Sequence, residues 1–548
     1  MVEIIQRHSV VNRSAHVLSY VESVAYVMVT LCNLKRQQQQ RIESGNGEED
    51  GTTGSSAASN VESYPTWAKA FAFGSSGLEA NVTSSDIDVY VGRVPNLPPC
   101  PLPFSPPFLR FKYLSHLPQC CSSFPFIFIR LLVCPLTITP QLFLAAFPAI
   151  LKQRGIEDAV TVSAARVPVV KFMLNDISVD VVCVSYASAS APAEKDFLPL
   201  SVFQCISKET RQSVQGFRTV LEIRRRIPVP LDVYSTTLRA IKFWAMQRKV
   251  YGNNYCYPAG VSLAVMVARV CQVFPASLPS AVVRFFFLFY RQWLGKQTTV
   301  SPLFITERLK PDPPPRIHGM WDTWDPLRDA CKEDLLPVLN PAYPHNNTCY
   351  NVGRSGRDHF YREIVRANAI IQQQQTPATA TIRWDDVWPA YRLGDEYNHF
   401  MIVEVAEMNG LSSSERQGFD SWALLIESKL KILLFSLECW CEVRMWPKRL
   451  SSTMRCQKGR AWAIGVKTGG PDPWTYPIEF LSRIAMSVEE FRFAVEEMGL
   501  RGANAFPRVV SSMPSPVCFL MTSLDAGLPE DLMPTPRTTT AKRGRTDD

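Results

Sequence analysis

Two aspartates lie close together in a strand-like segment, where acidic residues are otherwise rare. Asp86 and Asp88 alternate with Ile87 and Val89 in the segment "SSDIDVYV". On a strand the two carboxylates share one face, about 7 Å apart along the backbone. Such a pair becomes favourable when a divalent cation lies between the carboxylates, and Mg²⁺ readily takes carboxylate oxygen. The pattern favours a metal-binding pair, with a surface hairpin of solvated acids as the alternative.

A third aspartate, Asp180, lies in "DISVDVVCVSY", which alternates in the same way. Three carboxylates are the set that two-metal phosphoryl or nucleotidyl transfer requires, and the third can also deprotonate an attacking hydroxyl. Upstream of the pair, Gly74 and Ser75 predict a turn whose backbone N–H groups and hydroxyl can bind phosphate. The residue types together favour phosphoryl-transfer chemistry.

Composition limits the kind of protein that can carry this chemistry. A chain of 548 residues is too long for one compact core, so two to four domains are expected. The net charge of +8 permits a polyanionic partner without requiring one. The 15 cysteines are scattered and form no C-x₂-C pair, which disfavours structural zinc and fits a reducing intracellular location. The N-terminal residues lack the apolar run of a signal peptide.

Periodicity predicts the elements that must position these residues. A helix is expected over 17–44, followed by a flexible polar loop. Residues 167–187 predict a β-hairpin that carries Asp180, and the segment from Leu238 predicts amphipathic helices. Later segments alternate between strand and helix, beginning with "YNHFMIVEVAEMNG".

The stretch from Pro95 to Pro140 does not fit this organisation. It is crowded with Pro, Phe, Leu and Cys, holds no acidic residue and shows neither helical nor strand periodicity. We expect that it is not part of a domain core. A membrane span over 131–151 is one alternative, although its prolines argue against a regular helix. An exposed lid or insertion is another, and a segment that is not native coding sequence, such as a translated intron, is the interpretation we favour.

Basic residues gather near the C-terminal end of the chain. Between Val443 and Pro471 they occur without a single acidic residue, interleaved with Trp446 and Trp462. Such a stretch can hold phosphates electrostatically and stack bases on its aromatic rings. We predict RNA contact here, with an ordinary solvated loop as the alternative. The candidate RNA-binding residues are Arg444, Lys448, Arg449, Arg455, Lys458 and Arg460.

Several segments carry a family resemblance. The "FGS" at Phe73–Ser75, with "DID" beginning at Asp86, resembles the active-site signature of the DNA polymerase β-like nucleotidyltransferases. The segments "LRAIKFWA", "VYGN", "AGVSLAVMVARVCQVFP" and "NPAYPHNNTCYNV" are similar to central-domain and hinge motifs of the eukaryotic nuclear poly(A) polymerases. "ERQGFDSWALLIESKLKILLFSLE" is similar to a helix in the C-terminal RNA-binding domain of those enzymes.

The resemblance implies template-independent addition of adenylate from ATP to an RNA 3′ end, with two Mg²⁺ or Mn²⁺ ions. It assigns Asp86, Asp88 and Asp180 as the metal-binding catalytic triad. The positions that it assigns to ATP binding are Phe73, Gly74, Ser75, Lys242, Tyr251, Asn253, Gly260 and Val261. These residue types suit the roles, because lysine offers a charge to phosphates, tyrosine a ring to adenine, and glycine a close backbone approach.

Two departures from the family pattern stand out. Met246 occupies the position, one helical turn after Lys242, where the family commonly has a second lysine. A phosphate-directed charge is therefore missing unless Lys249 or Arg248 replaces it. The separation between Asp88 and Asp180 is also longer than in the family that the chain resembles, by roughly the length of the Pro/Phe-rich stretch. This excess falls between two strands that must lie side by side, which supports an insertion or a gene-model artefact at 95–140.

The predicted fold class is α+β, with a nucleotidyltransferase palm built on a mixed β-sheet, a helical central domain and an RRM-like RNA-binding domain. We place these domains at 64–205, 206–345 and 346–510, after an N-terminal helix and flexible loop (1–63) and before a disordered tail (511–548). The expected protein is a nuclear monomer outside the membrane, with RNA 3′ ends, ATP and 3′-end processing factors as partners. The alternatives are a terminal uridylyltransferase or other RNA nucleotidyltransferase, and a catalytically impaired RNA-binding relative.

Overall fold

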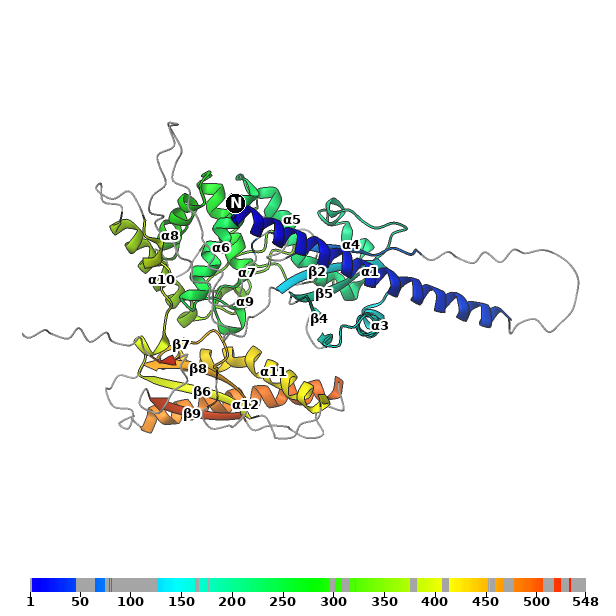
Figure 1. Cartoon of the computed structure of the whole chain (residues 1–548). Helices are drawn as coiled ribbons and strands as arrows, with labels where there is room; N and C mark the ends of the chain where they lie inside the picture. Colours follow the sequence, from blue (N-terminus) through cyan, green and yellow to red (C-terminus); the bar gives the residue numbers. More distant parts are fainter. Residues whose placement is uncertain are drawn as a thin grey trace, which may run out of the picture.

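The protein is represented by a computed structural model that describes most of the chain. The residues described are 2–45, 65–73, 78, 80, 127–162, 167–175, 177–295, 301–306, 316–320, 322–374, 382–406, 413–451, 453, 459–467, 478–505, 517–523 and 532–533. Two sheets and a group of helices make up the fold, and in chain order the helices come between the strands of the first sheet and those of the second (Figure 1).

The first sheet is mixed, as predicted for the palm. Its strands are β1 (Lys69–Ala72), β2 (Ile127–Pro135), β3 (Val160–Val162), β4 (Val169–Leu174) and β5 (Ile177–Tyr186). They lie in the order β1-β2-β5-β4-β3, in which β2 and β5 are parallel and the other neighbours are antiparallel. The predicted hairpin is therefore β4 and β5.

Strand alternation divides the apolar residues of this sheet between two cores. Leu132 and Val181 face the core beneath α3 (Pro140–Gln153), whereas Leu131 and Val182 face the opposite core with Phe217. The second core is closed by η1 (Glu194–Phe197), α4 (Val202–Cys205), η2 (Lys208–Val214) and α5 (Gln215–Arg226). A central strand that is buried on both faces reads as a continuous apolar run, which is why "IFIRLLVCP" of β2 showed no alternation.

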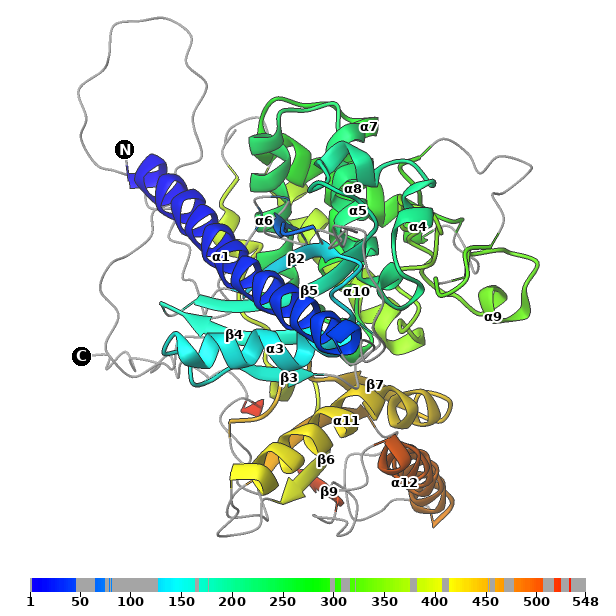
Figure 2. The same cartoon turned by 90° about the vertical axis from the view of Figure 1, so that its right-hand side faces the viewer.

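Helix α1 (Val2–Gly45) also packs on the palm, beside α3 (Figure 2). Its buried residues recur at helical spacing, among them Val17, Val21, Val24 and Met28. Each side chain of this size contributes about 1.5–3 kcal/mol when it is buried. The helix is thus part of the palm and not a separate N-terminal unit, and the loop expected after it lies outside the described residues. His16–Gln39 is long and apolar enough to cross a membrane, a criterion that a buried core helix also meets.

The prediction that 95–140 lies outside any domain core is wrong for its last third. Residues 127–135 are the strand between β1 and β5, and Pro140 begins α3 with the side chain of Thr139 as its N-cap. The alternative of a membrane span over 131–151 is also wrong, because these residues form a buried strand, a turn and a helix that packs on the sheet. Residues 95–126 lie outside the described part of the chain.

Helices follow the palm, as predicted for the central domain. They are α6 (Leu231–Gln247), η3 (Asn253–Tyr255), α7 (Gly260–Val273), α8 (Pro279–Gly295), α9 (Asp329–Lys332) and α10 (Arg354–Gln373). Trp244 is fully buried and contacts the rings of Phe286, Phe287 and Phe360 edge to face, with centroids 5.0–6.4 Å away. Because Phe360 lies on α10, this helix completes the central core, and the predicted boundary at residue 345 is too early.

The second sheet belongs to a C-terminal α+β unit. After η4 (Trp384–Asp386) and η5 (Leu393–Asp395), its elements are β6 (His399–Ala406), α11 (Ser413–Leu437), β7 (Glu442–Met445), β8 (Gly459–Lys467), α12 (Ile478–Ala505) and β9 (Val517–Ser523). The strands are antiparallel in the order β7-β8-β6-β9, the βαββαβ arrangement of ferredoxin-like folds. Since β9 pairs with β6, the sheet needs residues beyond 510, and the tail predicted over 511–548 contains its last strand.

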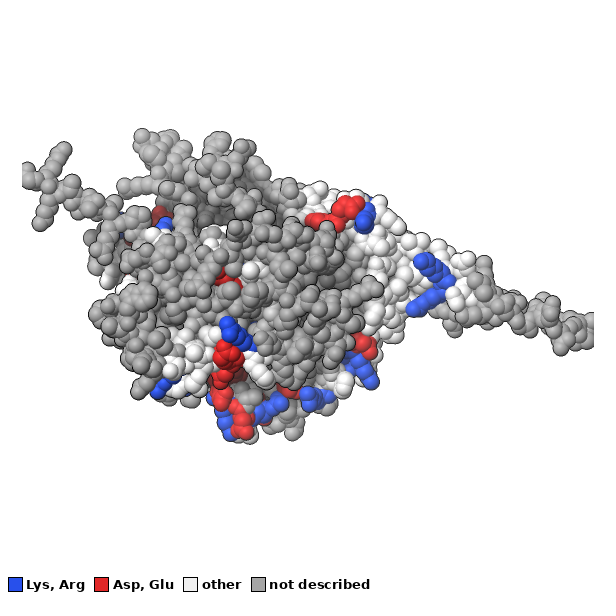
Figure 3. All heavy atoms as spheres, turned by 90° about the horizontal axis from the view of Figure 1, so that it is seen from below, with Lys and Arg blue, Asp and Glu red and all other residues white. Residues whose placement is uncertain are grey.

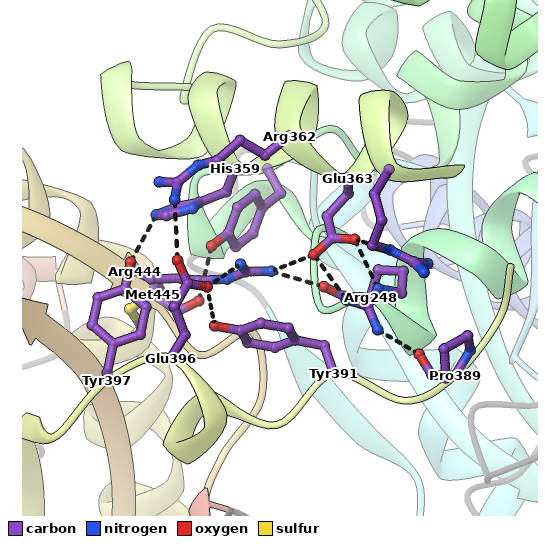
Figure 4. A network of polar contacts seen from close by, with 12 residues as sticks. Arg248, His359, Arg362, Glu363, Pro389, Tyr391, Glu396, Tyr397, Arg444 and Met445 are labelled. Carbon is purple, nitrogen blue, oxygen red and sulfur yellow. Dashed lines mark hydrogen bonds and ion pairs between the residues drawn. The ribbon is translucent and has the colours of Figure 1, made fainter. Parts of the chain in front are cut away.

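A buried ionic network joins the central helices to this second sheet (Figure 4). Arg248, at the end of α6, donates to both carboxylate oxygens of Glu363 on α10, at 2.7 and 3.1 Å. Arg444 on β7 donates to Glu363 at 3.5 Å and to Glu396 at 3.2 Å, and its guanidinium lies 3.5 Å from the centroid of the Tyr391 ring. Burial alone would raise the pKa of Glu363, but its arginine partners lower it. The carboxylate is therefore ionised and holds two domains together.

We expect Glu363→Gln to destabilise the protein by about 3–5 kcal/mol, because removing one partner of a buried ion pair leaves charges without compensation. Chemical denaturation followed by circular dichroism measures this free energy of unfolding. The matched control is Glu489→Gln, which breaks an exposed 2.8 Å pair with Arg492 on α12 and should cost about 0–1 kcal/mol. Equal effects of the two variants would contradict a structural role for the network.

Candidate active site

Asp180 is the predicted triad residue that the structure describes. It lies on β5 at 9% exposure, on the face shared with Val182 and Val184. Its Oδ2 accepts a 2.5 Å hydrogen bond from Nζ of Lys171, the residue opposite it on β4. Its Oδ1 is buried and has no hydrogen-bond partner among the described residues. One carboxylate oxygen is thus free to bind a ligand.

This free oxygen provides a test of whether the site suits a metal ion. A hard, buried and otherwise unsatisfied carboxylate oxygen fits Mg²⁺ or Mn²⁺ chemically. Within the described ranges, however, no group of three or more His, Cys, Asp and Glu side chains could hold a metal. Asp180 is therefore one fitting ligand that needs further carboxylates. The other predicted acids, Asp86 and Asp88, lie outside the described residues, as do Gly74 and Ser75.

Phe73 marks the end of the strand that leads to the predicted phosphate-binding turn. It follows Ala72, whose partner on β2 is Arg130, one residue beyond the partner of Asp180. Its ring packs on α5, where a Cβ added to Gly216 would lie 2.7 Å from the ring. A glycine is therefore needed at position 216. The contact holds the end of β1 at the same level of the sheet as Asp180.

Three of the residues predicted to bind ATP converge where α6 meets the start of α7. A Cβ on Gly260 would lie 3.2 Å from the Tyr251 hydroxyl and 4.0 Å from Nζ of Lys242. Lys242 is buried and donates to the carbonyl of Ala80 at 3.1 Å. Burial lowers the pKa of Lys242 to about 8, because the positive charge is poorly solvated there. An ammonium group beside a helix N-terminus makes this corner attractive to an anion.

The other two predicted ATP residues flank this corner. Val261 is exposed at the start of α7. Asn253 donates from Nδ2 to the Tyr350 hydroxyl at 3.2 Å, while its Oδ1 is buried without a partner in the described structure. An unsatisfied amide oxygen next to exposed residues can accept a hydrogen bond from a ligand.

Sequence reasoning missed the residues that complete this side of the site. Lys431 on α11 donates to Oδ1 of Asn351 at 2.7 Å, and Asn351 donates to the backbone carbonyl of Asn253 at 3.3 Å. The Lys431 ammonium also lies 5.8 Å from the centroid of the Tyr350 ring. A sequence signal did exist, because Tyr350 and Asn351 belong to the hinge segment "NPAYPHNNTCYNV". Their partner Lys431 lies in a separate domain and could not be identified from spacing.

Met246 stands where the family commonly has a second lysine, and two nearby basic residues could in principle replace that positive charge. Arg248 was one candidate to replace the missing lysine, but its guanidinium is held by Glu363 and by the Pro389 carbonyl at 2.7 Å. The other candidate, Lys249, has a positive φ of 55° and lies with Nζ 5.3 Å from the Trp446 ring. Lys242 is the lysine that the structure places beside Gly260 and Tyr251 at this corner.

The predicted RNA-binding residues divide into buried and accessible ones. Arg444 is 2% exposed and pairs with two glutamates, so the prediction that it contacts RNA is wrong. Arg449 pairs with Glu427 at 2.6 Å and remains one-third exposed. Lys448 lies 5.8 Å from the Trp446 ring, and Arg460 lies 5.7 Å from the Phe419 ring. Arg455 and Lys458 lie outside the described residues.

The surface view gives the electrostatic setting of these residues. Basic and acidic side chains of the described residues lie interspersed on the face seen in Figure 3. On the described part of this face, neither sign of charge forms a large cluster.

Comparisons with known families match the unit of the first sheet and the unit of the central helices. The poly(A) polymerase nucleotidyltransferase domain model matches residues 122–227, and the poly(A) polymerase central domain model matches residues 233–390. The first match begins just before β2 and leaves out Asp86 and Asp88.

Curated relatives carry the same name. The chain is 28% identical over 310 residues to poly(A) polymerase PAPalpha of Candida albicans, which covers 56% of this chain and 52% of that protein. It is 29% identical over 312 residues to poly(A) polymerase pla1 of Schizosaccharomyces pombe, covering 56% of this chain and 51% of the relative. Nuclear poly(A) polymerase 2 of Arabidopsis thaliana is 28% identical, covering 50% of this chain and 32% of the relative. The chain thus spans about half the length of the two fungal relatives.

A solved structure of the Cid1 poly(U) polymerase also matches, with a TM-score of 0.35 and 12% identity, covering 59% of this chain and 87% of that chain. This likeness is too low to distinguish one substrate from another. The sequence matches are the stronger finding: residues 122–227 and 233–390 match the models of the poly(A) polymerase nucleotidyltransferase and central domains.

Proposed function

We propose that the protein is a template-independent polynucleotide adenylyltransferase that adds AMP from ATP to RNA 3′ ends, as in mRNA polyadenylation. The observation that supports this most directly is the convergence of Lys242, Tyr251 and Gly260 at the start of α7. These residues belong to the segment that matches the poly(A) polymerase central domain. They offer an ammonium group, an aromatic ring and an open backbone, the groups that an adenine nucleotide needs.

In this proposal Asp86, Asp88 and Asp180 hold two Mg²⁺ or Mn²⁺ ions. Bound ions of this kind supply Lewis-acid stabilisation of the attacking and leaving oxygens. Asp180 contributes its unsatisfied Oδ1 as a ligand and helps to remove the proton from the RNA 3′-hydroxyl. Lys171 neutralises the other oxygen and keeps the carboxylate oriented.

The remaining ATP residues bind and orient the nucleotide. Lys242 pairs with the triphosphate, which Phe73, Gly74 and Ser75 approach from the end of β1. Tyr251 packs on the adenine ring, while Asn253 and Val261 line its edge. The binding energy is spent on alignment, because phosphoryl transfer depends mainly on the positions of the attacking oxygen and the α-phosphorus.

RNA binding is assigned to the C-terminal unit. The accessible candidates are Lys448, Arg449 and Arg460, together with Arg455 and Lys458. We further propose a nuclear monomer that works with 3′-end processing factors, in line with the nuclear relative in Arabidopsis. A terminal uridylyltransferase or another RNA nucleotidyltransferase, and a catalytically impaired RNA-binding relative, are the competing functions.

A primer-extension assay with a short oligo(A) RNA, Mn²⁺ and each nucleotide in turn distinguishes these functions. We expect ATP to be used at least about tenfold better than UTP, a difference of about 1.4 kcal/mol. Asp180→Asn should lower the extension that the chain supports, because it removes a metal ligand. Glu157→Gln, an exposed change on the palm, is the matched control. Preference for UTP would contradict the adenylate assignment.

A second test follows from the pKa of Lys242. Its value of about 8 means that the charged form is lost as pH rises through that value. ATP affinity, measured by calorimetry, should therefore fall between pH 7 and 9. Lys242→Met should weaken binding about 10- to 100-fold at pH 7, the worth of a charge-assisted hydrogen bond, and should remove this pH dependence.

The control for this test is Lys332→Met, which removes an exposed lysine on α9 and should change neither the affinity nor its pH dependence. If Lys242→Met keeps the pH dependence of the unmodified chain, Lys242 does not bind the triphosphate.

A further inference from the structure

Both edges of β5 are occupied at Asp180. On one side Lys171 of β4 is its direct partner, and on the other side Ile129 of β2 is its partner. A strand in a sheet has only two hydrogen-bonding edges. A second acid-bearing strand beside Asp180 must therefore replace β2 or β4, and β4 is joined to β5 by a tight hairpin.

Alternation defines which positions of β2 could bring a carboxylate to Asp180. Leu131 and Val133 pack in the same core as Val182 and Val184, so odd-numbered positions of β2 share the face of Asp180. Leu132 and Cys134 pack in the opposite core with Val181 and Cys183. Acids at positions 127 and 129 would lie on the face of Asp180, about 7 Å apart along the strand.

A direct connection of Val91 to Val133, called the joint below, meets this requirement. If Val91 is followed directly by Val133, Asp88 falls at position 129, and Asp86 at position 127. The same joint puts Ile87, Val89 and Val91 at positions 128, 130 and 132. Every residue assigned to the face that packs on α1 and α3 is then apolar, and both acids lie on the other face.

We infer that β2 holds the place of the catalytic strand, so that the chain with residues 92–132 is a low-activity form and the chain without them is the active polymerase. The inference rests on the proposed function, because it takes Asp86, Asp88 and Asp180 as one metal site.

The test compares the full chain with a deletion of residues 92–132, using oligo(A) extension with Mn²⁺ and each nucleotide. We expect the deletion to be at least about 100-fold more active, since metal-ion stabilisation is worth several kcal/mol. The added variant Asp180→Asn should abolish this gain. Equal activity of the full chain and the folded deletion variant, or no extension by the folded deletion variant, overturns the inference.

A deletion of residues 92–131 is the matched control, because it differs by one residue. A slip of one residue moves every side chain of a strand to the other face. Asp86 and Asp88 then fall at positions 126 and 128, in phase with Leu132 and away from Asp180. Activity of this variant equal to that of the 92–132 deletion would also overturn the inference.

Substitutions in the full chain keep the test decisive if the deletion variants do not fold. We expect Ile127→Asp with Ile129→Asp to acquire a Mn²⁺-dependent rise in melting temperature, and Ile127→Asn with Ile129→Asn to show none. The same response from both pairs overturns the inference. Nucleotide choice is a separate readout: a gain in UTP addition alone would contradict adenylate transfer and leave the strand exchange supported.

Discussion

The pairing of β2 with β5 is the constraint on which the palm depends. β5 runs through the middle of the sheet, and its two edges are taken by a parallel and an antiparallel neighbour. This arrangement buries Asp180 next to Lys171 and leaves one carboxylate oxygen for a ligand. Whichever strand lies next to Asp180 therefore decides whether one carboxylate or three meet at this point, and with it the chemistry of the site.

A second constraint links nucleotide binding to the C-terminal unit. Arg248 at the end of α6 reaches Glu363 and, through it, Arg444 of β7. On the other side, Lys431 of α11 reaches Asn253 through Asn351. The residues proposed to bind ATP thus lie between two polar links to the same unit. A ligand that binds Asn253 can therefore influence how this unit sits on the central helices.

Much of this fold could be predicted from the sequence, because period-two and period-3.6 patterns are strong in β5, α8 and α11. β2 could not, since a central strand that is apolar on both faces resembles an irregular hydrophobic stretch. Arg444 was misassigned because a linear run of basic residues does not reveal which of them find buried partners. Lys242, Tyr251 and Gly260 were selected by resemblance, and their spacing along the chain explains why they meet: each lies at the end or on the inner face of neighbouring helices.

The strand next to Asp180 can be identified by amide hydrogen exchange of the full chain, followed by mass spectrometry. Slow exchange reports ladder hydrogen bonds in the stable part of a sheet. We expect residues 129–134 to exchange as slowly as residues 180–185 of β5, their partners in the sheet. Fast exchange at 129–134 together with strong protection at 86–91 would contradict it, because the acid-bearing segment would then already lie beside Asp180.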